Sequence, residues 1–260
     1  MEAKQLRLPA QNQAEFLIIS YPKCGRTWLR LMLGRVFQTH FGLTNANLLE
    51  LHELAQLNPN IPKIWVSHDD KPQWKKPDEL VTDKGEYQDK KVILLVRDPR
   101  DVVVSNYFQK TKRRKVYDGS LSDYLQESLG SFDTILRFYN IWADNRTITQ
   151  KFILVRYEDL HDNSEGELSR ILDFFGLSGV RKETIIEAIE YTSFENMRKM
   201  ELENTFNSPR LNPLDPQDPD SYKTRQGKVG SFSDYLSPAE IDYLNRKMKE
   251  NLSDFYGYLT

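Results

Sequence analysis

The chain has 260 residues, of which 28% are charged, and its formal net charge is −2. This balance gives no reason to expect broad nucleic-acid binding or adhesion to an anionic membrane, so an anionic ligand has to be held by a local cluster of residues. Cys24 is the one cysteine, which excludes an intrachain disulfide and a metal site built on paired cysteines.

Residues 1–15 form a polar extension without the apolar core of a secretion signal, and no later apolar segment is long enough to span a bilayer. Together with the single cysteine, these features predict a soluble, cytoplasmic protein. The length suits one large α/β domain, and we expect residues 1–260 to form a single one.

The first motif is a tight turn, Tyr21–Trp28, between an apolar strand at 16–19 and an amphipathic helix. The first N–H groups of a helix lack intrahelical partners, so a phosphate can bind there. Gly25 allows close approach of the backbone, Lys23 adds a cation and Thr27 adds a hydroxyl. A glycine that only shapes the turn is an alternative. In the helix that follows we expect Arg30 and Arg35 to be solvated.

Residues 44–57 carry a weaker helical pattern, and a short strand at 64–67 then leads to His68. Enzymes of the α/β class place reactive groups at such strand ends, although a lone histidine is more often structural. The other histidines, which lie in or beside helical patterns, are treated as background: His40, His52 and His161.

The clearest buried strand, 92–96, delivers Arg97 into a turn, and Pro99 starts a helix that contains Ser105. An arginine and a hydroxyl make a good phosphate clamp, because the guanidinium binds two oxygens at once. The alternative is an ion pair of Arg97 with Asp98 or Asp101. The basic run 110–115 is expected to be a solvated loop, or to recognise an acidic substrate.

Helical patterns at 121–129 and 132–144 precede another strand at 152–155, which is followed by Tyr157 and a further helix. This alternation predicts an α/β fold with a mostly parallel central sheet flanked by helices. The ligand site is expected at the carboxyl edge of the sheet, where the turn at 21–28, His68, Arg97 and Tyr157 all follow strands.

Beyond residue 180 the strands stop, and helical patterns at 183–190 and after Thr192 are followed by a proline-punctuated segment. We expect residues 201–224 to be a mobile loop that can act as a lid. It leads to a second cationic, glycine-containing loop at 225–230. The last helix begins at Ser237 with a capping box.

With these segments in place, the sequence resembles the cytosolic-type sulfotransferases that use 3′-phosphoadenosine-5′-phosphosulfate (PAPS). Tyr21–Trp28 is similar to their 5′-phosphosulfate loop and Arg97–Tyr107 to their 3′-phosphate motif. Arg156–Leu160 is similar to a Tyr-Glu-Asp segment, and Arg225–Gly230 to their C-terminal Arg-Lys-Gly loop. The matches occur in order and cover most of residues 16–230, which implies the P-loop-like sulfotransferase fold.

The resemblance implies transfer of a sulfuryl group from PAPS to a hydroxyl of a small-molecule alcohol or phenol, with 3′-phosphoadenosine-5′-phosphate (PAP) as product and no obligatory metal. Lys23 is then the residue that stabilises the leaving phosphate, and His68 is the general base. The residues implied at the donor's 5′ end come from one turn: Cys24, Gly25, Arg26 and Thr27.

The rest of the donor site follows from the same resemblance. Trp28 and Phe194 are expected to sandwich the adenine, with Tyr157 and Thr192 at its edge. The residues implied at the 3′-phosphate are Arg97, Ser105, Arg225, Gln226 and Gly227.

Three positions depart from the family pattern: Arg26 replaces a threonine, Val66 replaces the lysine two residues before the histidine, and Gln226 replaces a lysine. The side chain of Arg26 is a candidate for the charge missing at Val66.

Neither the acceptor nor the oligomeric state follows from the sequence. The apolar candidates for an acceptor pocket are Trp74, Tyr107, Phe108 and Phe132.

Two other interpretations remain. The first is a P-loop kinase or NTPase, whose fingerprint has glycine before lysine, whereas Lys23 precedes the one glycine of the turn. The second is a catalytically silent nucleotide-binding protein, against which the presence of Lys23 and His68 argues.

Overall fold

The computed structural model of the protein describes residues 12–258, so residues 1–11 of the predicted polar extension lie outside the described part. A central sheet contains β1 (Phe16–Ser20), β2 (Ile64–Ser67), β3 (Lys91–Val96) and β4 (Lys151–Arg156). The strands are all parallel and follow the order β2-β1-β3-β4. The mostly parallel sheet predicted from the sequence is confirmed.

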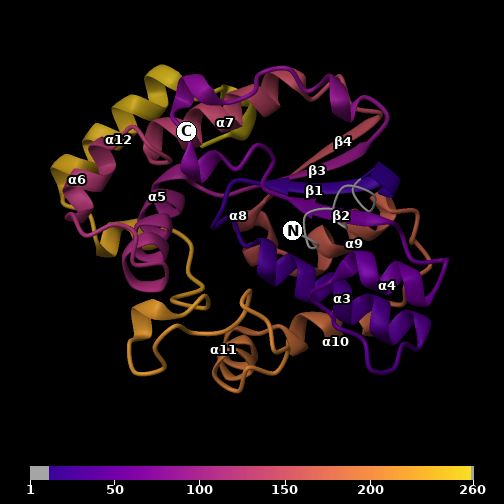
Figure 1. Ribbon diagram of the computed structural model, residues 1–260. Helices are drawn as coiled ribbons and strands as arrows, with labels where there is room; N and C mark the ends of the chain where they lie inside the picture. Colours follow the sequence, from indigo (N-terminus) through magenta and orange to yellow (C-terminus); the bar gives the residue numbers. More distant parts are fainter. Residues whose placement is uncertain (1–11, 259–260) are drawn as a thin grey trace, which may run out of the picture.

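Helices cover both faces of this sheet (Figure 1). The helices α7 (Phe132–Asn145) and α12 (Pro238–Asn251) lie on one side, and α3 (Arg26–Phe41), α9 (Ser164–Phe174) and α10 (Lys182–Tyr191) lie on the other. Every residue of β1 is buried, and β3 is buried from Val92 onward. Strands covered on both faces need continuous apolar sequence, which is why these two runs were the clearest strand signals.

Two predicted helices are shorter in the structure. The pattern at 44–57 yields only α4 (Leu51–Leu57), because Asn45 has a left-handed φ of 55° and the side chain of Asn47 accepts the Leu49 N–H in a turn. The pattern at 121–129 yields α6 (Leu121–Gln126), which starts at a capping box on Ser120 and stops where Glu127 becomes extended.

The basic run is only in part the solvated loop that was predicted, because Lys112, Arg114 and Lys115 are exposed but Lys110 and Arg113 are not. Residues Gln109–Arg113 form a π-helical continuation, η4, of α5 (Pro99–Phe108). Lys110 is buried, and the Arg113 side chain is 9% exposed and pairs with Glu201 at 3.2 Å. Long basic side chains bury their aliphatic stems when the charged end finds a partner, as Arg113 does here.

The remaining helices of the second half are α8 (Tyr157–Asp162) and α11 (Phe194–Leu202). The segment after α11 crosses the molecule beside the end of α5 (Figure 1) and buries Leu211 and Ser221. Its mobility, expected from the prolines, stays a prediction. The capping box predicted at the start of α12 is confirmed, with Glu240 N–H donating to Ser237 Oγ.

Candidate functional site

The phosphate-type turn follows β1 and ends at Gly25, which precedes the first residue of α3. Gly25 has a φ of 88°, and a Cβ added there would lie 2.5 Å from Tyr157 Cδ2. Both the backbone conformation and the lack of space therefore require glycine. No acidic residue occupies the first turn of α3, and the first intrahelical bond begins at Leu29. The preceding N–H groups are thus available to an anion.

His68 stands at the end of β2, beside the end of β1. The ring atom Nδ1 lies 2.9 Å from the carbonyl oxygen of Ser20, which follows from the pairing of Ser67 with Ile19 one residue earlier. Because a carbonyl oxygen can only accept, Nδ1 carries the proton and Nε2 keeps its lone pair. The geometry therefore presents a histidine whose free nitrogen can accept a proton.

The loop after His68 is fixed by a buried carboxylate. Asp69, which has a left-handed φ of 44°, accepts from Tyr87 Oη at 2.7 Å and Trp142 Nε1 at 3.1 Å, and pairs with Lys84 Nζ at 2.7 Å. These partners come from two other segments, residues 84–87 and α7, so the position of His68 depends on tertiary packing rather than on the local sequence.

Arg97 begins the turn after β3, and its guanidinium has several neighbours. Nη2 donates to Asp101 Oδ2 at 3.0 Å and to the Lys228 carbonyl at 2.8 Å, and the group stacks on the Tyr157 ring at 4.4 Å. The ion pair offered as the alternative for Arg97 thus exists. It does not remove Arg97 from the site, because Arg97 and Ser105 both line the cavity described below.

Asp101 connects the Arg97 turn to the C-terminal cationic loop. It accepts the N–H groups of Gly230 and Phe232, each at 2.9 Å, and the hydroxyl of Ser231 at 3.1 Å. Its side chain is fully buried. A segment more than a hundred residues away in the chain is thereby held at the carboxyl edge of the sheet.

Aromatic rings gather at one end of the site. Trp28 contacts the rings of Tyr157 and His161 with centroid separations of 5.7 and 6.4 Å. The ring of Phe194 lies against Gly227, where an added Cβ would be 2.4 Å from Phe194 Cδ2. His161 was treated as background from the sequence. That was wrong, since it lines the cavity and its Nε2 lies 3.1 Å from the Gly227 carbonyl oxygen.

These parts surround one cavity of about 380 Å³. The predicted site residues that line it come from six separate segments: Lys23, Gly25, Arg26, Thr27, Trp28, His68, Arg97, Ser105, Tyr157, Thr192, Phe194, Arg225, Gln226 and Gly227. Cys24 is the exception, because it is fully buried and its Sγ lies 3.4 Å from Tyr139 Oη in the core.

Several residues that line the cavity were not anticipated. Arg30, expected to be solvated, is 4% exposed and pairs with Glu50 at 3.1 Å, so that prediction was wrong. Lys223 and Arg210 come from the segment expected to be a mobile loop. The helical spacing of Arg30, four residues after Arg26, is the sequence signal that places both on one face of α3.

The predicted acceptor-pocket residues are not among those lining the cavity: Trp74, Tyr107, Phe108 and Phe132.

The cavity is strongly cationic. Burial, followed by Lys223 and other cations, lowers the pKa of Lys23 well below its usual value, and burial with Arg113 and Arg26 lowers the pKa of Lys223 to about 7. Burial and then Arg26 also lower the pKa of His68 well below 6.5, so its imidazole is neutral at pH 7. Clustered cations with depressed pKa values in one cavity indicate a site for a polyanion.

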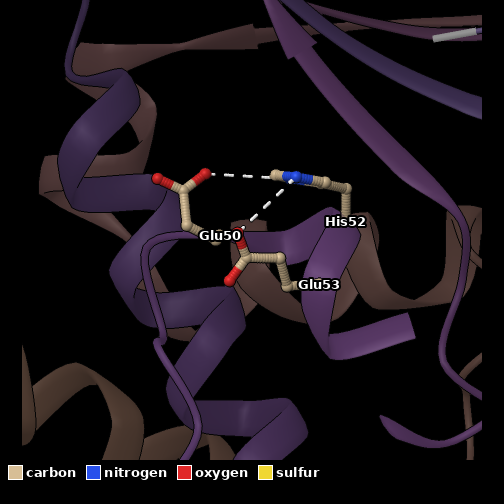
Figure 2. A group of neighbouring side chains, drawn as sticks. All are labelled: Glu50, His52 and Glu53. Carbon is tan, nitrogen blue, oxygen red and sulfur yellow. Dashed lines mark ion pairs between the residues drawn. The ribbon is translucent and has the colours of Figure 1, made fainter. Parts of the chain in front are cut away.

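A carboxylate cluster adjoins this cavity. The side chain of His52 lies between Glu50 and Glu53, with ion-pair distances of 3.7 and 3.8 Å (Figure 2). Ligand atoms of the three residues lie within 4.8 Å of one another, a spacing that would suit a metal ion. Both oxygens of Glu50 are, however, already engaged by Arg30 and Arg210, so Glu50 acts as a counter-charge to the arginines.

A family model described as "Sulfotransferase domain" matches residues 13–256, almost the whole chain. The chain belongs to the sulfotransferase family. The sulfotransferase is 24% identical over 258 residues to mouse sulfotransferase 2A1, covering 94% of this chain and 86% of the relative. It is 25% identical over 284 residues to cytosolic sulfotransferase 15 of Arabidopsis thaliana, covering 96% and 77%.

Solved structures agree on the fold of this sulfotransferase. Mouse sulfotransferase SULT7A1, solved in complex with PAP, superposes with a TM-score of 0.65 at 16% identity, covering 96% of this chain and 90% of that one. Retinol dehydratase, solved with androsterone and the inactive cofactor PAP, has a TM-score of 0.63 at 17% identity, with 92% and 80% covered. The sulfotransferase fold predicted from the motifs is confirmed.

None of the helices within residues 12–258 has the length and apolar character needed to cross a bilayer.

Proposed function

We propose that this sulfotransferase moves the sulfuryl group of PAPS to a hydroxyl group of a small-molecule acceptor in the cytoplasm. The observation that carries the proposal is the single cavity of about 380 Å³ that joins the turn before α3, the Arg97 cluster and a neutral His68. The donor carries phosphates at two separate positions, which match the turn before α3 with its Lys23 and the cluster around Arg97. A base beside one of these two phosphate sites, His68, suits transfer to a hydroxyl group.

The residues present fit such a donor. Arg97 Nε and Gln226 Oε1 are buried polar atoms without a hydrogen-bond partner among the described residues, as expected of groups that serve a ligand. Gly25 and Gly227 have no room for a Cβ beside Tyr157 and Phe194, so both backbone segments approach closely.

We assign the donor's parts as follows. Trp28 and Phe194 hold the adenine, with Tyr157 and Thr192 at its edge. Backbone N–H groups of the turn hold the 5′-phosphate, and the buried Cys24 contributes through its backbone alone. The residues assigned to the 3′-phosphate are Arg97, Ser105, Arg225, Gln226 and Gly227. When bound, the donor supplies an activated sulfuryl group whose leaving group is a phosphate.

The two catalytic roles follow from position and charge. His68 Nε2 accepts the proton of the acceptor hydroxyl, because Nδ1 is committed to the Ser20 carbonyl. Lys23 Nζ donates to Gln109 Oε1 at 3.1 Å, a neutral partner that a phosphate oxygen can replace. When Nζ donates to the leaving oxygen instead, Lys23 stabilises the negative charge that develops on that oxygen.

The proposal is tested with Lys23→Met and His68→Gln and radiolabelled PAPS. Each variant is expected to lower transfer by about 10²-fold or more, since positioned acid–base and charge-stabilising groups contribute on this scale. The affinity for PAP, measured by calorimetry, should stay close to that of the wild type for His68→Gln. His40→Gln, an exposed histidine of α3, is the matched control.

Wild-type rates of transfer in both variants would contradict the assigned roles. Binding of PAP without any sulfuryl transfer by the wild-type protein would favour the catalytically silent alternative. A preference for ATP with magnesium over PAP would instead favour the P-loop kinase.

A further inference from the structure

Three cations that line the cavity act on His68, and they are Arg26, Lys223 and Arg30. The apolar side chains of the lining are Trp28, Ile189, Phe194 and Met197, and Trp28 and Phe194 belong to the aromatic group described above. A pocket for a neutral phenol or alcohol is mostly apolar with a few polar groups. The lining around His68 therefore argues for an acceptor of a different chemical class.

Arg26 is the most informative of these cations. Its Nη1 is buried without a hydrogen-bond partner, and the side chain forms no ion pair with any residue of the described part of the chain. A buried guanidinium that lacks an acidic partner is costly, and such a group is expected to serve a ligand. Burial, then Arg30 and Arg210, lower the pKa of Arg26 to about 9, which shows how little negative charge compensates it.

Arg26 is coupled to the base. It is the cation with the largest electrostatic effect on His68, and its own electrostatic neighbours are Arg30 and Arg210. Arg26 and His68 line the same cavity, so an anion that pairs with Arg26 can lie beside His68.

Lys223 is the second cation of this group, and it acts on both His68 and Lys23. Within residues 12–258 its Nζ has no hydrogen bond or ion pair, although its backbone N–H is held by Glu201. It is coupled to both Arg26 and His68. Behind these groups, Arg30 and Arg210 share the single carboxylate of Glu50, which Figure 2 shows turned toward His52 as well. The charge of Glu50 is thus already used.

We infer that the acceptor is an acidic hydroxyl compound, whose carboxylate, sulfate or phosphate group is bound by Arg26 and Lys223 while its hydroxyl faces His68. This inference rests on the proposed function and names its acceptor class. It replaces the small apolar alcohol or phenol expected from the sequence. The basic run at 110–115 is not needed for it, because Lys112 is exposed and pairs with Asp218 at 3.9 Å.

The test uses two matched pairs of acceptors, 4-hydroxyphenylacetate with its amide and 4-(hydroxymethyl)benzoate with its amide. Each compound is titrated by calorimetry into the protein saturated with PAP, and turnover with radiolabelled PAPS is measured in parallel. The wild type is expected to bind and turn over the acid of at least one pair about tenfold or more better than its amide, as a charge-assisted contact allows. Arg26→Gln and Lys223→Met should each reduce this ratio severalfold.

Lys112→Met is the matched control and should leave the ratio unchanged. The inference is overturned if neither acid binds better than its amide, or if Arg26→Gln and Lys223→Met both leave the acid preference intact. It is also overturned if these two variants weaken PAP binding while the preference persists, since the cations would then serve the donor. Failure of the proposed function is distinguishable, because the wild type would then either not bind PAP or bind PAP without transferring a sulfuryl group to any of the four compounds.

Discussion

The buried carboxylate of Asp101 offers a sharp test of how the site is assembled. Asp101 accepts four hydrogen bonds, from Arg97, Gly230, Ser231 and Phe232, at 2.9 to 3.1 Å. In Asp101→Asn the side chain keeps a similar shape, but one carboxylate oxygen is replaced by an amide nitrogen, which can only donate hydrogen bonds. At least one of the facing N–H donors is then left without an acceptor, and Arg97 loses its ion-pair partner.

The expected loss of stability is about 3 kcal/mol. Breaking a buried ion pair by removing one charge costs about 3–5 kcal/mol, and the remaining oxygen keeps part of the hydrogen bonding. The free energy of unfolding is measured in urea. Because residues 228–232 are held to α5 through Asp101, their amide hydrogens should exchange faster and the affinity for PAP should fall about tenfold or more.

The control is Asp133→Asn, which removes a carboxylate that is 47% exposed and pairs with Lys247. Exposed pairs contribute about 0–1 kcal/mol, so this variant should be close to the wild type. Equal stability losses in the two variants would refute the argument from burial. A large loss in Asp101→Asn with unchanged exchange at 228–232 would refute the proposed link between Asp101 and the C-terminal loop.

Two further predictions concern the turn and the cationic cluster. Gly25→Ala and Gly176→Ala both place alanine at a left-handed φ, 88° and 81°, which should cost each variant about 1 kcal/mol of stability, and the clash in Gly25→Ala adds to its loss. Only Gly25→Ala clashes with Tyr157, so PAP affinity by calorimetry should fall in that variant alone; an equal fall in both would contradict the role of the close approach. Lys223 has a folded-state pKa of about 7, below the usual 10.5, so its buried charge destabilises the fold below pH 7 and this cost disappears as the pH rises to 10.5. Lys223→Met should therefore be more stable than the wild type at pH 6, by about 2–4 kcal/mol, with the difference shrinking above pH 7 in urea unfolding. Lys228→Met, whose lysine side chain is 61% exposed, should show no such pH dependence, and a pH-independent difference for Lys223→Met would contradict the pKa.

The motifs could be found in the sequence because each is local. The apolar runs of β1 and β3 indicate buried strands on their own, and the glycine and lysine of the turn stand next to each other in the chain. Parallel strands bring their carboxyl ends to one edge, so the convergence of the turn, His68, Arg97 and Tyr157 follows from strand order alone.

Other features depend on contacts between distant segments. Arg30 has the spacing of an exposed helix residue, yet Glu50 and the segment around Arg210 cover it. The basic run has the composition of a solvated loop, but Glu201 of α11 buries Arg113. No local pattern records either partner, which explains why the burial of Arg30 and of Arg113 was not predicted.

The sequence alone therefore determined the strands, the phosphate-type turn and the family, because backbone geometry and strand periodicity are set by neighbouring residues. Only the tertiary structure decided which charges meet around His68 and which of them lack a counter-ion. Electrostatic compensation is a property of three-dimensional distance and burial, and Arg26, Glu50 and Lys223 are far apart in the chain. That difference changes the expected acceptor from an apolar compound to an acidic one.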